Sequence, residues 1–133
     1  MKLTIYTDGG ARGNPGPAGI GVVIYNEKKE VIDKISEFLG VATNNQAEYR
    51  AILAGVKKAK ELGGTELDFY LDSELAVKQL NREYKVKNKD LAPLFLEIYN
   101  LSLSFKKITF THIPRALNAV ADSLANEAMD RGD

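Results

Sequence analysis

Two segments with alternating side chains each end on an aspartate, and this pair constrains the fold more than any other feature. Residues 4–8 and residues 68–72 both follow the two-residue side-chain period of a β-strand. Asp8 closes the first segment and Asp72 closes the second. If the two strands pair in parallel as neighbours, both carboxylates point into one crevice at the carboxyl end of the sheet, where open α/β folds place their chemistry.

A third acid, Glu48, lies near the start of a helix expected over residues 45–62. Apolar residues recur on its face of that helix, which puts the acid in the first turn of the side expected to be buried; they are Ala51, Ile52, Gly55, Val56 and Ala59. Capping is the alternative, because residues 43–46 match a capping box and Glu48 lies three residues after Asn45. For a helix considered alone, capping is the favoured interpretation.

The fourth acid, Asp122, belongs to a final helix expected over residues 117–129. Ala119 and Ala125 flank it at three residues on either side, and these small side chains leave room for a ligand to approach. An isolated aspartate at such a position is more often a solvated helix residue. The case for Asp122 therefore depends on the other three acids.

Taken together, the four acids predict a site for divalent cations. Carboxylates confined to a small patch repel one another and raise at least one pKa, a cost that a bound cation removes. The sequence has no cysteine and a single histidine, His112, which excludes thiolate zinc sites and multi-histidine sites. Ligation by oxygen alone favours hard ions such as Mg²⁺ or Mn²⁺.

The order of strand and helix signals predicts the fold class. A glycine-rich stretch over residues 9–17 lacks the Gly-Lys-Ser/Thr ending of a phosphate-binding loop and enters a strand, so we interpret it as a turn. Asp90 is expected to cap the third helix. We expect an α/β fold with a five-stranded mixed sheet in the order β-β-β-α-β-α-α-β-α and helices on its faces. The strands are expected at about 2–8, 19–25, 31–39, 66–72 and 107–113, and the helices at about 45–62, 74–81, 91–101 and 117–129.

Composition sets broad limits on the class of protein. A length of 133 residues with 44% hydrophobic content favours one globular domain over residues 1–133. No apolar run approaches the roughly 20 residues of a membrane span, and residues 1–4 enter a strand without a secretory leader pattern. No apolar heptad or interface strip appears. We therefore expect a cytoplasmic monomer with no membrane contact.

Charge is balanced overall, with 18 basic and 18 acidic residues. Bulk electrostatics therefore gives no sign of tight, nonspecific binding to nucleic acid. Basic residues do gather locally, at Arg82, Lys85, Lys87 and Lys89. Such runs are usually solvated surface, and contact with phosphate is the alternative.

Four motifs are spread along the chain, each on an element where chemistry is expected. They are Thr7-Asp8-Gly9-Gly10 with Gly13-Asn14-Pro15-Gly16-Pro17, Thr43-Asn44-Asn45-Gln46-Ala47-Glu48, Leu71-Asp72-Ser73, and Pro114-Arg115 with Asn118 and Ala121-Asp122. In this order they resemble the type 1 ribonuclease H family across essentially the whole chain. The chain is most similar to the compact branch of archaea and many bacteria, because residues 82–89 are too short to form the basic helical protrusion of other members.

The resemblance implies a catalytic site that holds two Mg²⁺ or Mn²⁺ ions when substrate is bound. Its carboxylates are Asp8, Glu48, Asp72 and Asp122. Two ions about 3.5–4 Å apart can activate a water on one side of a phosphate and stabilise the leaving oxygen on the other. The implied activity is endonucleolytic cleavage of the RNA strand of an RNA–DNA hybrid, which leaves a 5′-phosphate and a 3′-hydroxyl.

The resemblance also implies that polar side chains around two of these motifs bind the hybrid. They are Asn14, Thr43, Asn44, Asn45 and Gln46. Amides both donate and accept, so they suit the 2′-hydroxyl that distinguishes RNA from DNA, and Thr43 resembles a residue that holds a phosphate of the DNA strand. Turns and helix caps are the competing roles for these residue types, and one amide can serve both.

The loop histidine that many members use near the leaving group or the metals has no good match here. His112 lies ten residues before Asp122, but it belongs to the alternating run 108–112, where a satisfied structural imidazole is the favoured interpretation. The compact branch looks to place an arginine in that position, and Arg115 is our candidate. A guanidinium stays protonated, so it can stabilise phosphate charge but cannot shuttle a proton.

Three alternatives keep part of this interpretation. A related nuclease would act on double-stranded RNA, or on DNA as integrases and resolvases do. A noncatalytic module would bind hybrid without cutting it, and a structural protein would carry the acids by coincidence. The amides at Asn14, Asn44 and Asn45 favour RNA sensing, and the presence of all four acids argues against a noncatalytic module.

Overall fold

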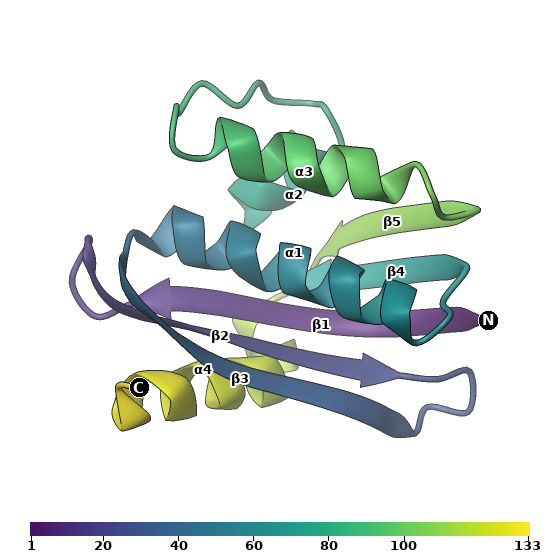
Figure 1. Cartoon of the computed structure of the whole chain (residues 1–133), viewed down its shortest axis with the longest axis horizontal. Coiled ribbons are helices and arrows are strands. Elements are labelled where there is room, and N and C mark those ends of the chain that lie inside the picture. The colour runs from purple at the N-terminus through teal and green to yellow at the C-terminus, as the bar shows by residue number, and fades with distance from the viewer.

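The computed structural model describes residues 1–133, and a five-stranded mixed sheet with helices on both faces forms its centre (Figure 1). The strands are β1 (Lys2–Ala11), β2 (Gly16–Tyr25), β3 (Val31–Ala42), β4 (Glu66–Leu71) and β5 (Lys107–His112). The helices are α1 (Asn44–Glu61), α2 (Glu74–Leu80), α3 (Ala92–Ser102) and α4 (Ala119–Arg131), and a 3₁₀ turn spans Arg115–Leu117. The predicted order of strands and helices is confirmed.

The sheet is antiparallel on one side of β1 and parallel on the other. Its strands lie in the order β3-β2-β1-β4-β5. β1 pairs antiparallel with β2 and parallel with β4, and β4 pairs parallel with β5. The parallel pairing of the two strands that carry Asp8 and Asp72 is the arrangement that the sequence predicts.

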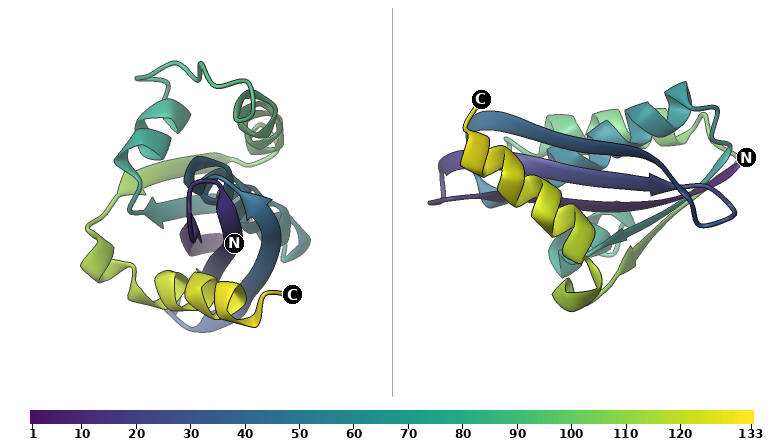
Figure 2. Two further views of the ribbon diagram at one scale, coloured as in Figure 1. Left: turned by 90° about the vertical axis from the view of Figure 1, so that its left-hand side faces the viewer. Right: turned by 90° about the horizontal axis from the view of Figure 1, so that it is seen from below.

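The two faces of the sheet carry different helices (Figure 2). On one face, α1 packs on β1 and β2 and α3 packs against α1, and apolar side chains of these helices and of β1, β2 and β4 form the main core. On the other face, α4 crosses β1, β2 and β3. The largest fully buried side chains of the core are Tyr49, Phe69, Leu3, Ile5, Ile20, Ile24, Ile52, Leu67, Leu71, Leu91 and Ile98.

Several boundaries differ from the predicted ones. β1 continues to Ala11 and β2 begins at Gly16, so the turn between them is shorter than the glycine-rich stretch. The prediction that Asp90 caps α3 is wrong, because Leu91 is the N-cap and the backbone N–H of Asp90 donates to Asn88 Oδ1 over 2.7 Å. The last helix begins only after the 3₁₀ turn. No helix combines the length and apolar content that crossing a lipid bilayer demands.

Candidate active site

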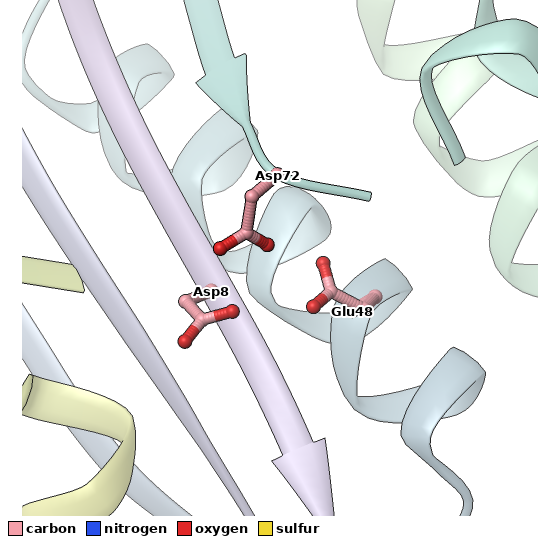
Figure 3. A group of neighbouring side chains, drawn as sticks. All are labelled: Asp8, Glu48 and Asp72. Carbon is pink, nitrogen blue, oxygen red and sulfur yellow. The ribbon is translucent and has the colours of Figure 1, made fainter. Parts of the chain in front are cut away.

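The first two acids meet because β1 and β4 run side by side. Tyr6 lies opposite Tyr70 in this parallel pair, and the two rings stack with centroids 5.3 Å apart. Asp8 lies two residues after Tyr6, and Asp72 lies two residues after Tyr70. Both carboxylates therefore lie at the same end of the parallel strand pair. Figure 3 shows Asp8 on β1 beside Asp72, which directly follows the end of β4.

Glu48 reaches these acids because α1 comes unusually close to β1. A Cβ atom on Gly9 would lie 2.3 Å from the backbone of Ala47, so only glycine allows this approach. The N–H of Gly9 points toward Glu48 Oε1 at 3.4 Å, a long hydrogen bond. The contact fixes Glu48 beside Asp8 on a helix that the sheet holds in place.

The capping interpretation of Glu48 is wrong. Thr43 is the N-cap of α1, its hydroxyl accepts from the N–H of Gln46 over 3.1 Å, and Gln46 Oε1 accepts from the N–H of Thr43 over 2.9 Å. Gln46 therefore completes the capping box. Glu48 is free of that role and only 9% exposed.

Asp8, Glu48 and Asp72 each place a carboxylate oxygen so that the three oxygens lie within 4.8 Å of one another (Figure 3). Burial raises the pKa of Asp8 from 3.8 to about 7, with further contributions from the charge of Asp72 and from Asp122. Burial, and then the charges of Asp8 and Asp72, also raise the pKa of Glu48 well above its usual value. The cluster thus concentrates negative charge that the folded chain disfavours.

The residues present fit a divalent cation. None of the three clustered acids forms an ion pair with a lysine or arginine of the protein. Glu48 Oε2 is buried and has no hydrogen-bond partner. Buried polar atoms of this kind normally find a partner, and oxygen atoms at this spacing suit a hard ion such as Mg²⁺.

Asp122 joins the same cleft from the opposite face of the sheet. Gly21 is the register partner of Asp8 in β2, and a Cβ atom there would lie 2.1 Å from the carbonyl oxygen of Ala121. This glycine lets the first turn of α4 approach the strand that carries Asp8. Asp122 is not part of the tight group of three acids, but it lies close enough to Asp8 to help raise its pKa.

The four acids line an open cleft with a volume of about 450 Å³, which we call the acidic cleft. Its other polar members come from the loop after β1, from α1, from the 3₁₀ turn and from α4. The full lining is Asp8, Gly9, Gly10, Ala11, Arg12, Asn44, Glu48, Asp72, Arg115, Asp122, Asn126 and Met129. Its lining is mostly polar, unlike the predominantly apolar pockets that bury small molecules.

The structure separates Arg115 from His112. Arg115 lines the acidic cleft, and its Nη2 lies 3.4 Å from Asp122 Oδ1 with the arginine side chain 79% exposed. His112 ends β5, is exposed and does not line the cleft. Its ring makes no hydrogen bond within the protein, so the satisfied structural role that we favoured for it is not observed.

The predicted hybrid-binding residues gather at the start of α1 and in the facing loop. Asn44 Oδ1 accepts from the N–H of Ala11 over 2.8 Å, and Asn14 Oδ1 accepts from the N–H of Asn44 over 3.1 Å. Thr43 and Gln46 serve the capping box, and Asn45 is exposed. Asn44 alone of these five lines the acidic cleft.

Two polar residues of the cleft escaped the sequence analysis. Arg12 lies in the turn after β1, and Asn126 lies four residues after Asp122 on the same face of α4. The helical spacing from Asp122 is a signal that points to Asn126. For Arg12 the only signal is its place inside the glycine-rich motif.

Comparisons with known proteins agree with this fold. A family model described as reverse transcriptase-like matches residues 6–128. The ribonuclease H1 of the halophilic archaeon Halobacterium salinarum superposes with a TM-score of 0.95 at 37% identity, over 98% of this chain and 99% of that one. The chain belongs to the type 1 ribonuclease H family.

Two further relatives extend the comparison. LC11-RNase H1, isolated from compost by a metagenomic approach and solved in complex with an RNA/DNA hybrid, has a TM-score of 0.93 and 44% identity over 97% of both chains. A bifunctional protein of Mycobacterium tuberculosis is 45% identical over 131 residues. Those residues make up 98% of this chain but 36% of that protein, so the chain spans about a third of this curated relative.

The ribonuclease H fold here lacks a basic helical protrusion, as the sequence predicts. α2 ends at Leu80 and α3 begins at Ala92, and residues 81–91 between them contain no helix. The basic residues of this connection are exposed. The basic residues therefore belong to a loop between α2 and α3 and not to a separate helix.

Proposed function

We propose that this ribonuclease H-like domain, over residues 1–133, is an endoribonuclease that hydrolyses the RNA strand of RNA–DNA hybrids with Mg²⁺ or Mn²⁺. The observation that carries the proposal is the group of three carboxylates, Asp8, Glu48 and Asp72, with oxygens within 4.8 Å of one another in an open cleft. The raised pKa values of Asp8 and Glu48 support it. They show that the ionised carboxylates are destabilised by burial and mutual repulsion, and a bound cation would offset both effects.

Four side chains would hold the metal. Asp8, Glu48 and Asp72 supply the tight group, and Asp122 supplies a further carboxylate from α4. Two bound ions would supply an activated water and stabilise the leaving oxygen, giving 5′-phosphate and 3′-hydroxyl ends. The protein contributes rigidity, since Asp8 lies in β1, Asp72 directly follows the neighbouring β4, and Glu48 is fixed by the close contact at Gly9.

Arg115 contributes positive charge at the rim of the cleft. Its guanidinium lies near Asp122 and is mostly exposed, so it can turn toward a phosphate that enters beside the acids. A charge-assisted hydrogen bond from a guanidinium stabilises the charge that builds on the phosphate during displacement. Arg115 takes no part in proton transfer.

The amides around the start of α1 would distinguish RNA from DNA. Asn14 and Asn44 already hold the loop after β1 against α1, and each retains unused donors on its amide nitrogen. Asn45 is exposed, while Thr43 and Gln46 keep spare acceptor or donor capacity beyond the capping box. These groups can meet a 2′-hydroxyl or a phosphate in a shallow groove.

A cleavage assay tests the proposal. End-labelled RNA–DNA hybrid, double-stranded RNA and double-stranded DNA are each incubated with Mg²⁺, Mn²⁺ or chelator. We expect the wild type to cut only the RNA of the hybrid, and only with metal. Asp8→Asn should abolish cutting, while the matched control Asp33→Asn, which alters an acid of β3 paired with Lys58 outside the cleft, should cut normally.

Other outcomes are equally informative. Cutting of double-stranded RNA at a comparable rate would contradict the proposed specificity for RNA–DNA hybrids. Binding of hybrid with no cutting under any metal condition would indicate the noncatalytic module. Cutting that persists in chelator, or in Asp8→Asn, would show that the proposed metal site is not needed for catalysis.

A further inference from the structure

The acidic cleft has a second half that the four acids do not occupy. Beyond Asp8 it is lined by Gly10, Ala11, Arg12, Asn44, Asn126 and Met129. Arg12 is the only charged side chain among these six. The cleft therefore has two arginines, Arg12 in this half and Arg115 near Asp122. Its other charged side chains are the four acids.

Arg12 is held by an aspartate of α4. Its Nη2 lies 2.6 Å from Asp130 Oδ1, with side chains that are 49% and 66% exposed. Arg115 is paired with an aspartate of the same helix, Asp122. Each cation of the cleft is thus paired with a carboxylate of α4.

The loop that carries Arg12 is anchored, so the guanidinium is presented from a fixed base. The N–H of Arg12 donates to the carbonyl of Pro17 over 2.8 Å. The neighbouring N–H of Ala11 donates to Asn44 Oδ1, and the N–H of Asn44 donates to Asn14 Oδ1. These bonds tie the loop to the start of α1, and only the side chain of Arg12 has to move to exchange partners.

The pair between Arg12 and Asp130 is a weak competitor for a phosphate. Ion pairs between exposed side chains contribute little, because water and salt screen them. A phosphodiester carries the same single negative charge as the carboxylate and can likewise accept a bidentate, charge-assisted hydrogen bond from the guanidinium. A nucleic-acid strand in the cleft can therefore displace Asp130 at small cost.

We propose that Arg12 binds a phosphate of the RNA strand on the opposite side of the acid cluster from Arg115, and that Asp130 holds this arginine until nucleic acid arrives. The proposal rests on the proposed function, because it takes the strand in the cleft to be RNA. Asn126, which lines the cleft one helical turn after Asp122, borders the same subsite. Arg12 is a substrate-binding residue, and Asp130 acts only through it.

Binding measurements on four proteins test this subsite. Asp8→Asn is the common background, so that hybrid affinity is measured without cleavage by fluorescence anisotropy over a range of salt. Adding Arg12→Ala should weaken binding about 5- to 20-fold at low salt and reduce the salt slope by about one. Adding Asp130→Asn should tighten binding about 2- to 5-fold, because the guanidinium is free from the start. With both changes, binding should equal that of Arg12→Ala.

A matched control separates the subsite from bulk charge. Glu97→Gln, in the same background, also removes one negative charge and releases a cation, Lys57, at an exposed pair of 3.1 Å between α3 and α1. It should leave affinity within about twofold of the background. Thermal melts of each variant confirm that the proteins compared are folded.

Three results would overturn the proposal. One is unchanged affinity and salt slope in Arg12→Ala. Another is an Asp130→Asn gain that survives in the Arg12→Ala background. The third is an equal gain from Glu97→Gln. Each of these leaves the proposed function intact if the wild type still cuts hybrid, whereas a wild type that neither binds nor cuts hybrid would overturn both.

Discussion

The Nδ2 amide of Asn118 donates a hydrogen bond to the carbonyl oxygen of Thr7 over 2.9 Å in the interior of the protein. The backbone carbonyl of Asn118 in turn accepts from the N–H of Asp122 over 3.0 Å. One residue, only 1% exposed, therefore joins the strand position before Asp8 to the helical turn that carries Asp122. It fixes the distance between an acid of the central strand β1 and an acid of the helix α4 that crosses it.

We predict that Asn118→Ala lowers the free energy of unfolding by about 1–3 kcal/mol, because the carbonyl of Thr7 loses a buried partner. Hybrid cleavage should fall at least about tenfold, because Asp122 is no longer fixed relative to Asp8. Steady-state rates at a temperature where the variant is fully folded check this expectation.

Asn81→Ala is the matched control for Asn118. Its side chain also donates to a backbone carbonyl, that of Phe110 over 3.1 Å, but at an exposed position away from the cleft. The control should keep its activity. Equal losses of activity in the two variants would show that Asn118 has no positioning role.

We predict that Asp8→Asn stabilises the metal-free protein at neutral and higher pH. Burial raises the pKa of Asp8 from 3.8 to about 7, so the folded state disfavours its charge. Well below pH 3.8 the side chain is protonated in both the folded and the unfolded state, so the penalty vanishes; it grows as pH rises and is complete above about pH 7. The gain in unfolding free energy should therefore rise from near zero at pH 4 to roughly 1–3 kcal/mol at pH 8.

Urea denaturation in chelator, at several pH values, measures this gain. Asp33→Asn is the comparison, because that acid is paired with Lys58 over 3.5 Å and gains nothing from neutralisation. A gain from Asp8→Asn that stays constant with pH, or that is larger at pH 4 than at pH 8, would contradict the assigned cause.

Arg115→Ala should reduce hybrid cleavage by about 10- to 100-fold, since it removes a cation at the rim of the acidic cleft. His112→Ala should leave cleavage within about twofold, because His112 is exposed and does not line the cleft. Single-turnover rates of both variants decide the ranking. The reverse order would return the catalytic role to the histidine.

The pairing of Asp8 with Asp72 could be predicted because a strand has a strict two-residue period. Once two such strands are taken as parallel neighbours, the positions of Asp8 and Asp72 relative to each other follow. The same holds for the lack of a protrusion, which depends only on the length of the connection between α2 and α3.

The role of Glu48 could not be decided from local sequence, because a capping acid and a site acid occupy the same end of a helix. What decides it is a contact between distant segments, the close approach of Ala47 to Gly9. Asp122 likewise depends on Gly21, a residue of β2. Arg12 lies in a turn without a periodic pattern, so only the three-dimensional structure brings it to the cleft, whereas Asn126 could have been found from its helical spacing to Asp122.

Calorimetric titration of Mg²⁺ and Mn²⁺ into the nucleic-acid-free protein tests the metal site most directly. The wild type and the control Asp33→Asn should bind both ions. Asp8→Asn, Glu48→Gln and Asp72→Asn should each bind at least about tenfold more weakly, because each removes a charged oxygen from one shared site. Unchanged ion affinity in all three variants would contradict the claim that these carboxylates form a divalent-cation site.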